Sequence, residues 1–357
     1  MSKRSKQTPV PFPPPRVSVA RSAGYTPGEQ PRQGEKIIKL NTNENPYPPS
    51  PHVAEAIQSF DFASLRRYPS PMADEFREAA AQLYGISPAQ VLAGNGSDDI
   101  LNIVLRAYLD AGDVLAYPTP SYSLYSVLAG IHGARVLPVP WGPGWSLPAE
   151  QLATTGARVV FITNPNAPSG TVVPTETLRK FAHSFGGLIL IDEAYVEFAD
   201  ENGLSLLADC PNVLLCRTLS KSYSLAGLRF GYVLGAAQVI DELAKVKDSY
   251  NCDALAITAA TAALKDQPYA RSTWARVKTE RARMVAELTG RGFDVIPSQT
   301  NFLFVRPPKA DGGSLYAHLK QKGILVRHFD KPGLSDRIRI SIGTHEENTD
   351  LLAALPG

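Results

Sequence analysis

The sequence is poor in cysteine and has no large excess of charge of either sign, and each shortage excludes a class of protein. The 357 residues include three cysteines (Cys210, Cys216 and Cys252), an odd number that is too small for a disulfide framework. We therefore expect reduced thiols and a cytoplasmic protein. The 36 Lys and Arg residues are balanced by 34 Asp and Glu residues, a net charge of +2, which argues against a nucleic-acid partner.

Long apolar segments are also missing, so the sequence predicts no membrane-spanning helix and no membrane partner. The chain begins with basic residues, Lys3, Arg4 and Lys6, but prolines follow them in place of an apolar segment. This pattern argues against a secretory signal. We expect residues 1–15 to form a disordered, proline-rich tail. The full chain is 44% hydrophobic, enough to bury a large core in more than one domain.

Short apolar runs alternate with helical patterns through the middle of the chain. The expected strands are residues 113–117, 158–163, 187–191, 213–216 and 230–234, and the expected helices include 72–84, 100–109, 124–131 and 175–184. This alternation predicts an α/β fold with a mostly parallel central sheet flanked by helices. The last third differs, since a long charged helix over 271–291 and short strands at 302–305, 324–327 and 337–341 indicate a smaller α+β domain.

These patterns predict four parts of the chain. Residues 1–15 are the tail, and residues 16–50 are an N-terminal segment that packs with the small domain. Residues 51–268 form the large domain that carries the ligand, and residues 269–357 form the small C-terminal domain.

Polar clusters follow three of the expected strands. They are Asn164–Asn166, Asp192–Tyr195 and Thr218–Lys221, and in a parallel sheet ligands bind beyond the carboxyl ends of the strands. A Gly94-x-Gly96-Ser97 turn opens a helix, which suits either an anion site or an ordinary helix cap. Residues 41–49, rich in Asn and Pro, predict either a turn or a loop that covers a polar ligand.

The residue types around Lys221 suit an aldehyde cofactor that carries a phosphate. Lys221 supplies an amine, the preceding Ser220 a hydroxyl and the later Arg229 a fork-shaped cation for the phosphate. A lone Ser-Lys pair is more often a surface feature, so the neighbouring clusters have to support this interpretation. Asp192 ends a very apolar strand and needs a cationic partner, either a protonated ring nitrogen or an arginine.

Three motifs in order carry a family resemblance. They are Asn-Pro-Asn-Ala-Pro-Ser-Gly (164–170), Asp-Glu-Ala-Tyr (192–195) and Thr-Leu-Ser-Lys-Ser-Tyr-x-Leu-Ala-Gly-Leu-Arg-x-Gly (218–231). From about Tyr25 to its end, the chain resembles the fold-type I aminotransferases that depend on pyridoxal 5′-phosphate, and more narrowly the histidinol-phosphate aminotransferase family. The resemblance implies amino transfer from L-histidinol phosphate to 2-oxoglutarate, giving imidazole acetol phosphate and glutamate, in histidine biosynthesis.

The resemblance also implies roles for individual residues. Lys221 links covalently to the cofactor and moves the substrate proton, Asp192 pairs with the ring nitrogen, and Tyr195 bonds the ring hydroxyl. The other implied cofactor contacts are Gly96, Ser97, Asp98, Ser220 and Arg229 at the phosphate, Tyr122 stacked on the ring, and Asn166. Where the family usually has an asparagine, this chain has Ala167, so either Asn166 takes that role or Tyr195 acts alone.

Four further residues match positions that contact the substrate or a second subunit. Tyr25, Arg327 and Arg339 resemble substrate contacts, although a solvated strand arginine is the common alternative. Tyr68 resembles a tyrosine that reaches the phosphate of the neighbouring subunit, which implies a homodimer with shared sites. No metal is implied.

Other functions stay open from the sequence. An aromatic amino acid aminotransferase or a phosphothreonine-type decarboxylase would use the same cofactor on another substrate. A regulatory module that binds the cofactor without catalysis would need a DNA-binding domain, for which the short tail leaves no room. A nucleotide-binding α/β protein would need a better glycine motif than Gly94-x-Gly96.

Overall fold

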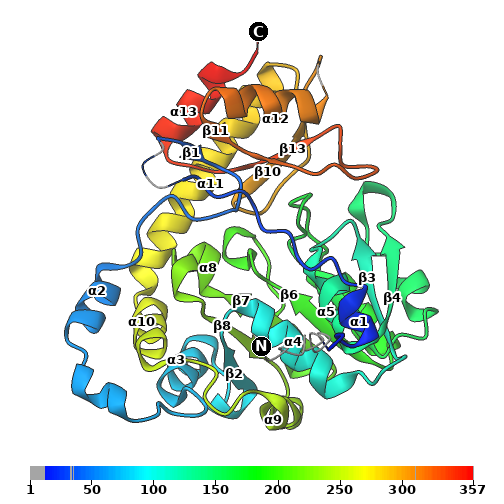
Figure 1. The fold of residues 1–357 in the computed structure, drawn as a ribbon, viewed down its shortest axis with the longest axis vertical. Coiled ribbons are helices and arrows are strands. Elements are labelled where there is room, and N and C mark those ends of the chain that lie inside the picture. The colour runs from blue at the N-terminus through cyan, green and yellow to red at the C-terminus, as the bar shows by residue number, and fades with distance from the viewer. Residues whose placement is uncertain (1–12, 33, 35, 310, 357) are drawn as a thin grey trace, which may run out of the picture.

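The computed structural model describes residues 13–32, 34, 36–309 and 311–356. The expected tail therefore lies, for residues 1–12, outside the described residues. Figure 1 shows a large sheet with its helices in the lower part and a smaller C-terminal unit above it, with the long helix α11 (Gln267–Gly290) running between them. Among the described residues, no helix is long and apolar enough to cross a membrane.

The large sheet has seven strands in the order β2-β8-β7-β6-β5-β3-β4. Their bounds are β2 (Val91–Gly94), β3 (Val114–Thr119), β4 (Arg135–Pro140), β5 (Val159–Thr163), β6 (Leu188–Asp192), β7 (Val213–Thr218) and β8 (Gly231–Leu234). All neighbours run parallel except β8, which is antiparallel to β2 and β7. The predicted α/β fold with a mostly parallel sheet is confirmed.

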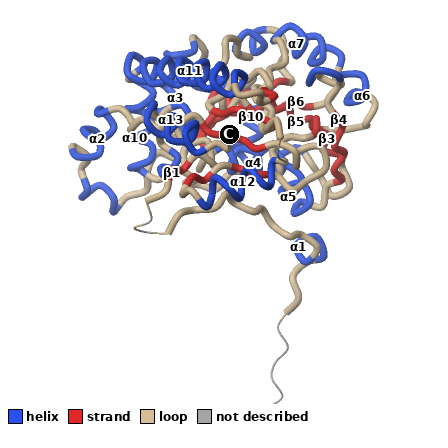
Figure 2. Tube along the Cα trace, turned by 90° about the horizontal axis from the view of Figure 1, so that it is seen from above, coloured by secondary structure: helices blue, strands red, loops and turns tan. Residues whose placement is uncertain are grey.

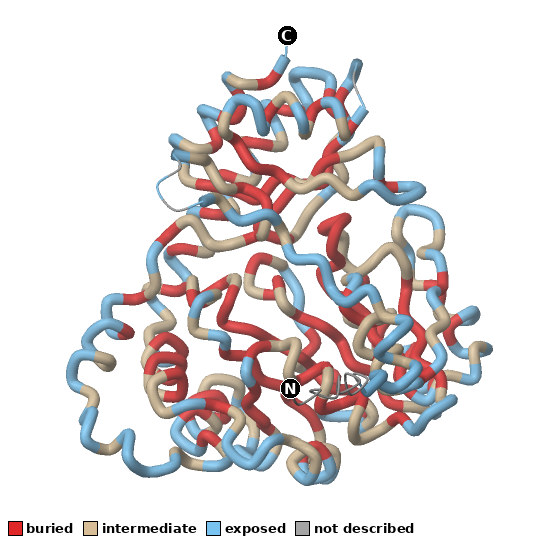
Figure 3. The backbone as a smooth tube through the Cα atoms, in the orientation of Figure 1, coloured by how far each residue is buried: buried red, intermediate tan, exposed pale blue. Residues whose placement is uncertain are grey.

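Helices cover both faces of this sheet, which explains why its strands are apolar without alternation. One face packs against α2 (Pro51–Gln58), α3 (Asp74–Tyr84), α6 (Ala149–Ala153), α7 (Thr175–Ser184) and α10 (Ala254–Lys265). The other face packs against α4 (Ser97–Tyr108), α5 (Leu124–His132) and α9 (Ala237–Val246). Ile189 and Ile191 of β6 belong to the first core and Leu190 to the second. Figure 3 shows the central strands as buried throughout.

The C-terminal unit is built on a four-stranded antiparallel sheet in the order β12-β13-β10-β9. Its elements are β9 (Asp294–Val295), β10 (Phe302–Arg306), α12 (Gly312–Gln321), β11 (Ile324–Leu325), β12 (Arg327–His328), β13 (Ile338–Ser341) and α13 (His345–Ala354). The N-terminal strand β1 (Ile38–Lys39) pairs in parallel with β11. The short helix α1 (Val17–Ala20) stands at the far end of the N-terminal segment, away from these strands (Figure 2).

Several elements appear in the structure that the sequence patterns did not predict, among them strand β4 and helix α10. Strand β4 contains Pro138 and Pro140, which break a strand pattern, and it lies at the edge of the sheet where proline is tolerated. Helix α10 is rich in alanine and buried on most sides, so it lacks the contrast between polar and apolar faces that marks a surface helix.

Candidate active site

Lys221 lies where β7 passes directly into the four-residue helix α8 (Leu219–Ser222). The Thr218 side chain caps this helix by accepting the Ser220 N–H at 3.2 Å. The Lys221 amine donates to the Thr42 carbonyl oxygen at 2.7 Å. Burial, aided by the positive charge of Arg339, lowers the pKa of Lys221 to about 8, although the Glu44 carboxylate opposes the shift. A substantial fraction of the amine is therefore neutral near neutral pH.

Asp192 is the last residue of β6 and is only 4% exposed. Its carboxylate accepts the Tyr125 hydroxyl at 2.6 Å and the Ala194 N–H at 3.2 Å. Burial raises its pKa to about 6, and these hydrogen bonds offset part of the shift. No basic side chain in the described part of the chain forms an ion pair with Asp192, so its charge lacks the cation that burial requires.

Tyr125 is a site residue that the sequence analysis missed. Its hydroxyl also contacts the Thr163 hydroxyl at 2.8 Å, and Thr163 in turn contacts Ser121 at 2.7 Å. Tyr125 thus bonds one oxygen of Asp192 directly, and Thr163 and Ser121 orient the Tyr125 hydroxyl through a chain of hydroxyl contacts. In the sequence Tyr125 reads as one more apolar residue of helix α5, so no local signal distinguished it from the core.

Tyr195 is buried beside the loop that follows β1. Its hydroxyl accepts the Asn43 side-chain amide at 2.9 Å, and the Asn43 N–H donates to Ser341 at 2.9 Å. Because Thr42 contacts Lys221 and Asn43 contacts Tyr195, the loop over residues 41–49 lies at the site. The Asn43 contact is a second feature that the sequence analysis did not identify.

Gly96, Ser97, Asp98, Ser220 and Arg229 lie together at the N-terminus of α4. Gly96 has φ 84°, and a Cβ there would lie 2.6 Å from the Arg229 guanidinium, so only glycine suits this position. Arg229 contacts Ser220 Oγ at 3.4 Å and Asp98 at 3.6 Å. The first N–H groups of a helix have no acceptor within the helix, so this group offers several donors to one anion.

The rings of Tyr122 and Tyr25 pack against each other beside these residues. Tyr122 donates its hydroxyl to Asp98 at 3.2 Å, and burial, together with the Asp98 charge, raises its pKa. Its ring lies edge-on to Tyr25, with 5.8 Å between ring centroids, and edge-on to Tyr125 at 5.6 Å. The structure thus brings Tyr25, about 100 residues away in sequence, against Tyr122.

Asn166 is buried and only partly satisfied. Its amide nitrogen donates to Ser169 at 2.8 Å and to the Pro120 carbonyl at 3.3 Å, while its side-chain oxygen has no partner. Asn164, by contrast, exchanges both hydrogen bonds with the Val173 backbone and is purely structural. The unused oxygen of Asn166 is free to accept a hydroxyl from a ligand.

Arg327 and Arg339 are paired across neighbouring strands β12 and β13. Arg339 donates to the Asn41 carbonyl at 3.1 Å, but its Nε is buried without a partner, and burial lowers its pKa. Within the described ranges no carboxylate forms an ion pair with it. Arg327 contacts the Pro27 carbonyl at 3.4 Å. These two guanidinium groups are suited to an anionic ligand.

Tyr68 is the candidate that the structure does not bring to this group. Its side chain is 80% exposed, and its ring stacks on Tyr250 with 4.4 Å between centroids. Phe62 and Leu65, close by in sequence, are also large exposed apolar residues. Tyr68 therefore lies in a segment of the chain that exposes several large apolar side chains.

The donor set fits pyridoxal phosphate, which joins an aldehyde, a phosphate and a ring nitrogen that can carry a proton. Lys221 would hold the aldehyde, and the α4 N-terminus with Ser220 and Arg229 would hold the phosphate. Asp192, a buried carboxylate without a cation, would pair with the ring nitrogen.

Comparisons with known proteins agree with this arrangement. The family model for aminotransferase class I and II matches residues 35–355. A histidinol-phosphate aminotransferase 1 of Nostoc sp. is 49% identical over 340 residues, covering 95% of this chain and 96% of the relative. The histidinol-phosphate aminotransferase of Syntrophotalea carbinolica is 46% identical, covering 96% and 98%.

A solved structure gives the same result. The histidinol-phosphate aminotransferase of Sinorhizobium meliloti, crystallised in complex with pyridoxal 5′-phosphate, superposes with a TM-score of 0.84 at 29% identity, covering 99% of this chain and 98% of that one. The chain therefore belongs to the class I and II aminotransferase family and is an aminotransferase.

Proposed function

We propose that this enzyme uses pyridoxal 5′-phosphate to transfer the amino group of L-histidinol phosphate to 2-oxoglutarate, giving imidazole acetol phosphate and glutamate. The names of its relatives support the amine, since those at 42–49% identity are all histidinol-phosphate aminotransferases. The observation that carries the proposal is that Asp192 and Arg339 are buried charges without an ion partner, and that Arg339 lies close enough to the Lys221 amine to lower its pKa.

Lys221 is the group that moves the proton. When bound, pyridoxal phosphate supplies an aldehyde and an electron-withdrawing ring that takes up the electron pair of the substrate Cα–H bond. The Lys221 Nζ, with its pKa near 8, would remove the proton from the substrate Cα and deliver it to the former aldehyde carbon, C4′, and it would make the reverse transfer, from C4′ to Cα, with the keto acid in the second half-reaction. The Thr42 carbonyl, 2.7 Å away, orients this nitrogen.

The other residues bind and orient. Asp192 keeps a protonated ring nitrogen in place, and Tyr125 holds the carboxylate by a short hydrogen bond. Tyr195 and the unused oxygen of Asn166 are the candidates for the ring hydroxyl. Arg339 and Arg327 bind the anionic end of the substrate, because a guanidinium without a carboxylate partner gains most from a phosphate or carboxylate.

We also propose a homodimer in which Tyr68 reaches the neighbouring site. Support comes from the exposure of Phe62, Leu65 and Tyr68 within one short segment, since exposed large apolar side chains favour contact with another protein surface. Sedimentation should give twice the chain mass, and a monomer with full activity would refute the shared site.

The test of the substrate is a panel of amines at one fixed concentration of 2-oxoglutarate. We expect kcat/KM for histidinol phosphate to exceed the values for phenylalanine and tyrosine by at least about tenfold, because the unpaired Arg339 favours the phosphate. Equal values would favour an aromatic amino acid aminotransferase, and release of carbon dioxide from a phosphorylated amino acid would favour a decarboxylase. Replacing 2-oxoglutarate with pyruvate tests the acceptor in the same assay.

A further inference from the structure

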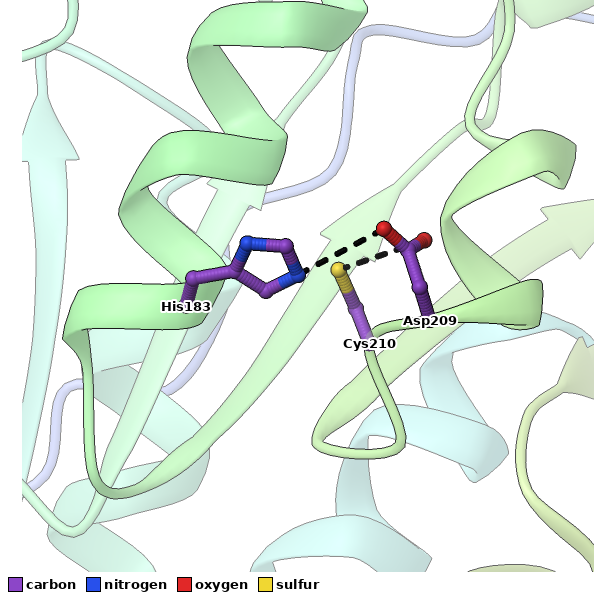
Figure 4. Close-up of side chains that lie close together, drawn as sticks. All are labelled: His183, Asp209 and Cys210. Carbon is purple, nitrogen blue, oxygen red and sulfur yellow. Dashed lines mark hydrogen bonds and ion pairs between the residues drawn. The ribbon is translucent and has the colours of Figure 1, made fainter.

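A cluster of potential metal ligands lies at the end of the sheet opposite the active site. His183 is near the C-terminus of α7, and Asp209 and Cys210 lie in the loop that leads into the first residue of β7. Their ligand atoms all lie within 4.8 Å of one another. Figure 4 shows the imidazole, the carboxylate and the sulfur pointing toward a common point.

The distances between these atoms match a tetrahedral site. His183 Nε2 lies 3.5 Å from Asp209 Oδ2, and Cys210 Sγ lies 3.8 Å from Asp209 Oδ1. Around a tetrahedral zinc ion with bonds of about 2.0–2.3 Å, neighbouring ligand atoms lie roughly 3.3–3.6 Å apart. The two distances end on different oxygens of Asp209, and all three ligand atoms lie within 4.8 Å of one another, so side-chain rotation has to bring them closer to a common ion.

Hydrogen bonds to backbone carbonyls hold the end of α7 and the loop before β7 together. The Asn212 side-chain amide donates to the carbonyl oxygens of Ala182 at 3.0 Å, Phe185 at 3.0 Å and Gly187 at 3.2 Å. The Cys210 N–H donates to Leu206 at 2.8 Å. The end of α7 and the loop before β7 are therefore fixed relative to each other before any ion binds, which lowers the cost of assembling a site.

Arg179 supports the carboxylate and does not block it. Its guanidinium hydrogen-bonds Asp209 Oδ1 and donates to Ser205 at 3.0 Å, which leaves Oδ2 facing His183. Metal-ligating carboxylates are commonly oriented by such outer hydrogen bonds.

We propose that His183, Asp209 and Cys210 form a binding site for a divalent transition metal of the zinc class, with a fourth position open to solvent. Imidazole and thiolate together favour zinc or cobalt over magnesium or calcium. Side chains of His183 and Asp209 are half exposed, so an ion can enter. The Cys210 thiol loses its proton to solvent when the ion binds.

The experiment is a Co²⁺ titration of the cofactor-loaded enzyme, followed by difference absorbance against the same enzyme without cobalt. We expect one ion per chain with a sulfur-to-cobalt charge-transfer band. Cys210→Ser should lose the band, and His183→Ala, at an exposed position, should weaken binding at least about tenfold. X-ray absorption of the zinc form should show one sulfur at about 2.3 Å.

His52→Ala removes another exposed histidine, on α2, and is the matched control that should bind like the wild type. Transamination by His183→Ala should equal that of the wild type, because the site lies away from Lys221. A titration without the sulfur band would overturn the proposal. So would equal affinities of His183→Ala and the wild type, or a band that persists in Cys210→Ser.

Discussion

Asp192 and Glu193 are consecutive buried carboxylates with opposite surroundings. Glu193 accepts the Arg217 Nε at 2.8 Å, lies 2.7 Å from its Nη2, and accepts the Gly203 N–H at 2.6 Å. Asp192 accepts only a hydroxyl and one backbone N–H. The two neighbouring carboxylates thus differ in their surroundings, because Asp192 lacks a counter-charge whereas Glu193 is fully paired.

The same contrast separates two arginines. Arg217 is buried and paired with Glu193, whereas Arg339 has a buried Nε without a partner and no carboxylate beside it among the described residues. A buried pair is costly to break, while an isolated buried charge costs stability until a ligand compensates it. In this comparison the two charges that the fold leaves without an ion partner, Asp192 and Arg339, are those that we propose to meet the ligand.

Removing the Lys221 amine should have the largest effect on activity. Lys221→Ala is expected to lower transamination at least about 10³-fold, because no other base can move the Cα proton. The yellow absorbance that the wild type gains with added pyridoxal phosphate should also vanish. Lys245→Ala, an exposed lysine on α9, is the control. Near-normal turnover by Lys221→Ala would refute its assignment.

Removing the charge of Asp192 should change activity and stability in different ways. We expect Asp192→Asn to lower kcat roughly 10²–10³-fold, since the ring nitrogen loses its ion pair. In the cofactor-free chain the Asp192 pKa is raised from 3.8 to about 6, so the folded state binds more protons than the unfolded state between these values. Stability attributable to Asp192 therefore falls as pH rises through this window.

Urea unfolding of the cofactor-free protein at pH 4 and pH 7 measures the contribution of Asp192 to the free energy of unfolding. The wild type should lose stability on the order of 3 kcal/mol from Asp192 between the two values, and Asp192→Asn should not. Comparing the two proteins at each pH cancels the contributions of other groups. An Asp192→Asn variant that is less stable than the wild type at pH 7 would show that the carboxylate is part of the structural framework.

Neutralising the paired carboxylate should give the reverse result. Glu193→Gln leaves Arg217 buried without its partner, so we expect a loss of about 3–5 kcal/mol in the free energy of unfolding. The folded fraction should keep most of its kcat. Replacing both partners, as in Glu193→Gln with Arg217→Met, should recover part of the stability. If the single change is neutral for stability, the contrast with Asp192 fails.

The smallest expected effect is on substrate binding. Arg339→Ala should raise KM for the phosphorylated amine about 10- to 100-fold with a smaller change in kcat, because the guanidinium binds the anionic end of the substrate. Arg337→Ala, on the same segment but paired with Asp294, is the control. An unchanged KM in Arg339→Ala would place the substrate anion elsewhere.

The sequence predicted the features that depend on local pattern. Continuous apolar runs indicated the buried parallel strands, and Asp192 and Lys221 follow two of them directly, so their place at the carboxyl edge could be expected. Tyr125 could not be found in this way, because its contact with Asp192 depends on how α5 packs on the sheet. The roles of the predicted site residues, including Tyr68, stay predictions until the variants are measured.

Contacts between distant segments explain most of what the sequence missed. Asn43 reaches Tyr195 across 152 positions of sequence, and the partial satisfaction of Asn166 depends on Ser169 and Pro120. Whether a charge is paired is likewise a property of the packed structure. Asp192 and Glu193 look equivalent as letters, and only the position of Arg217 distinguishes them.

The pairing of β1 with β11 couples the lysine mechanically to the far end of the chain. Leu40 accepts the Ser341 N–H at 2.9 Å, and Asn301 donates to the Asn43 carbonyl at 2.9 Å, so Thr42 and Asn43 are anchored on the C-terminal sheet. Any rigid-body rotation of that sheet carries the carbonyl that orients Lys221 along with it. A fragment that starts after residue 50 would lack β1 and the loop that follows it. The Lys221 amine would then lose the Thr42 carbonyl as its hydrogen-bond acceptor.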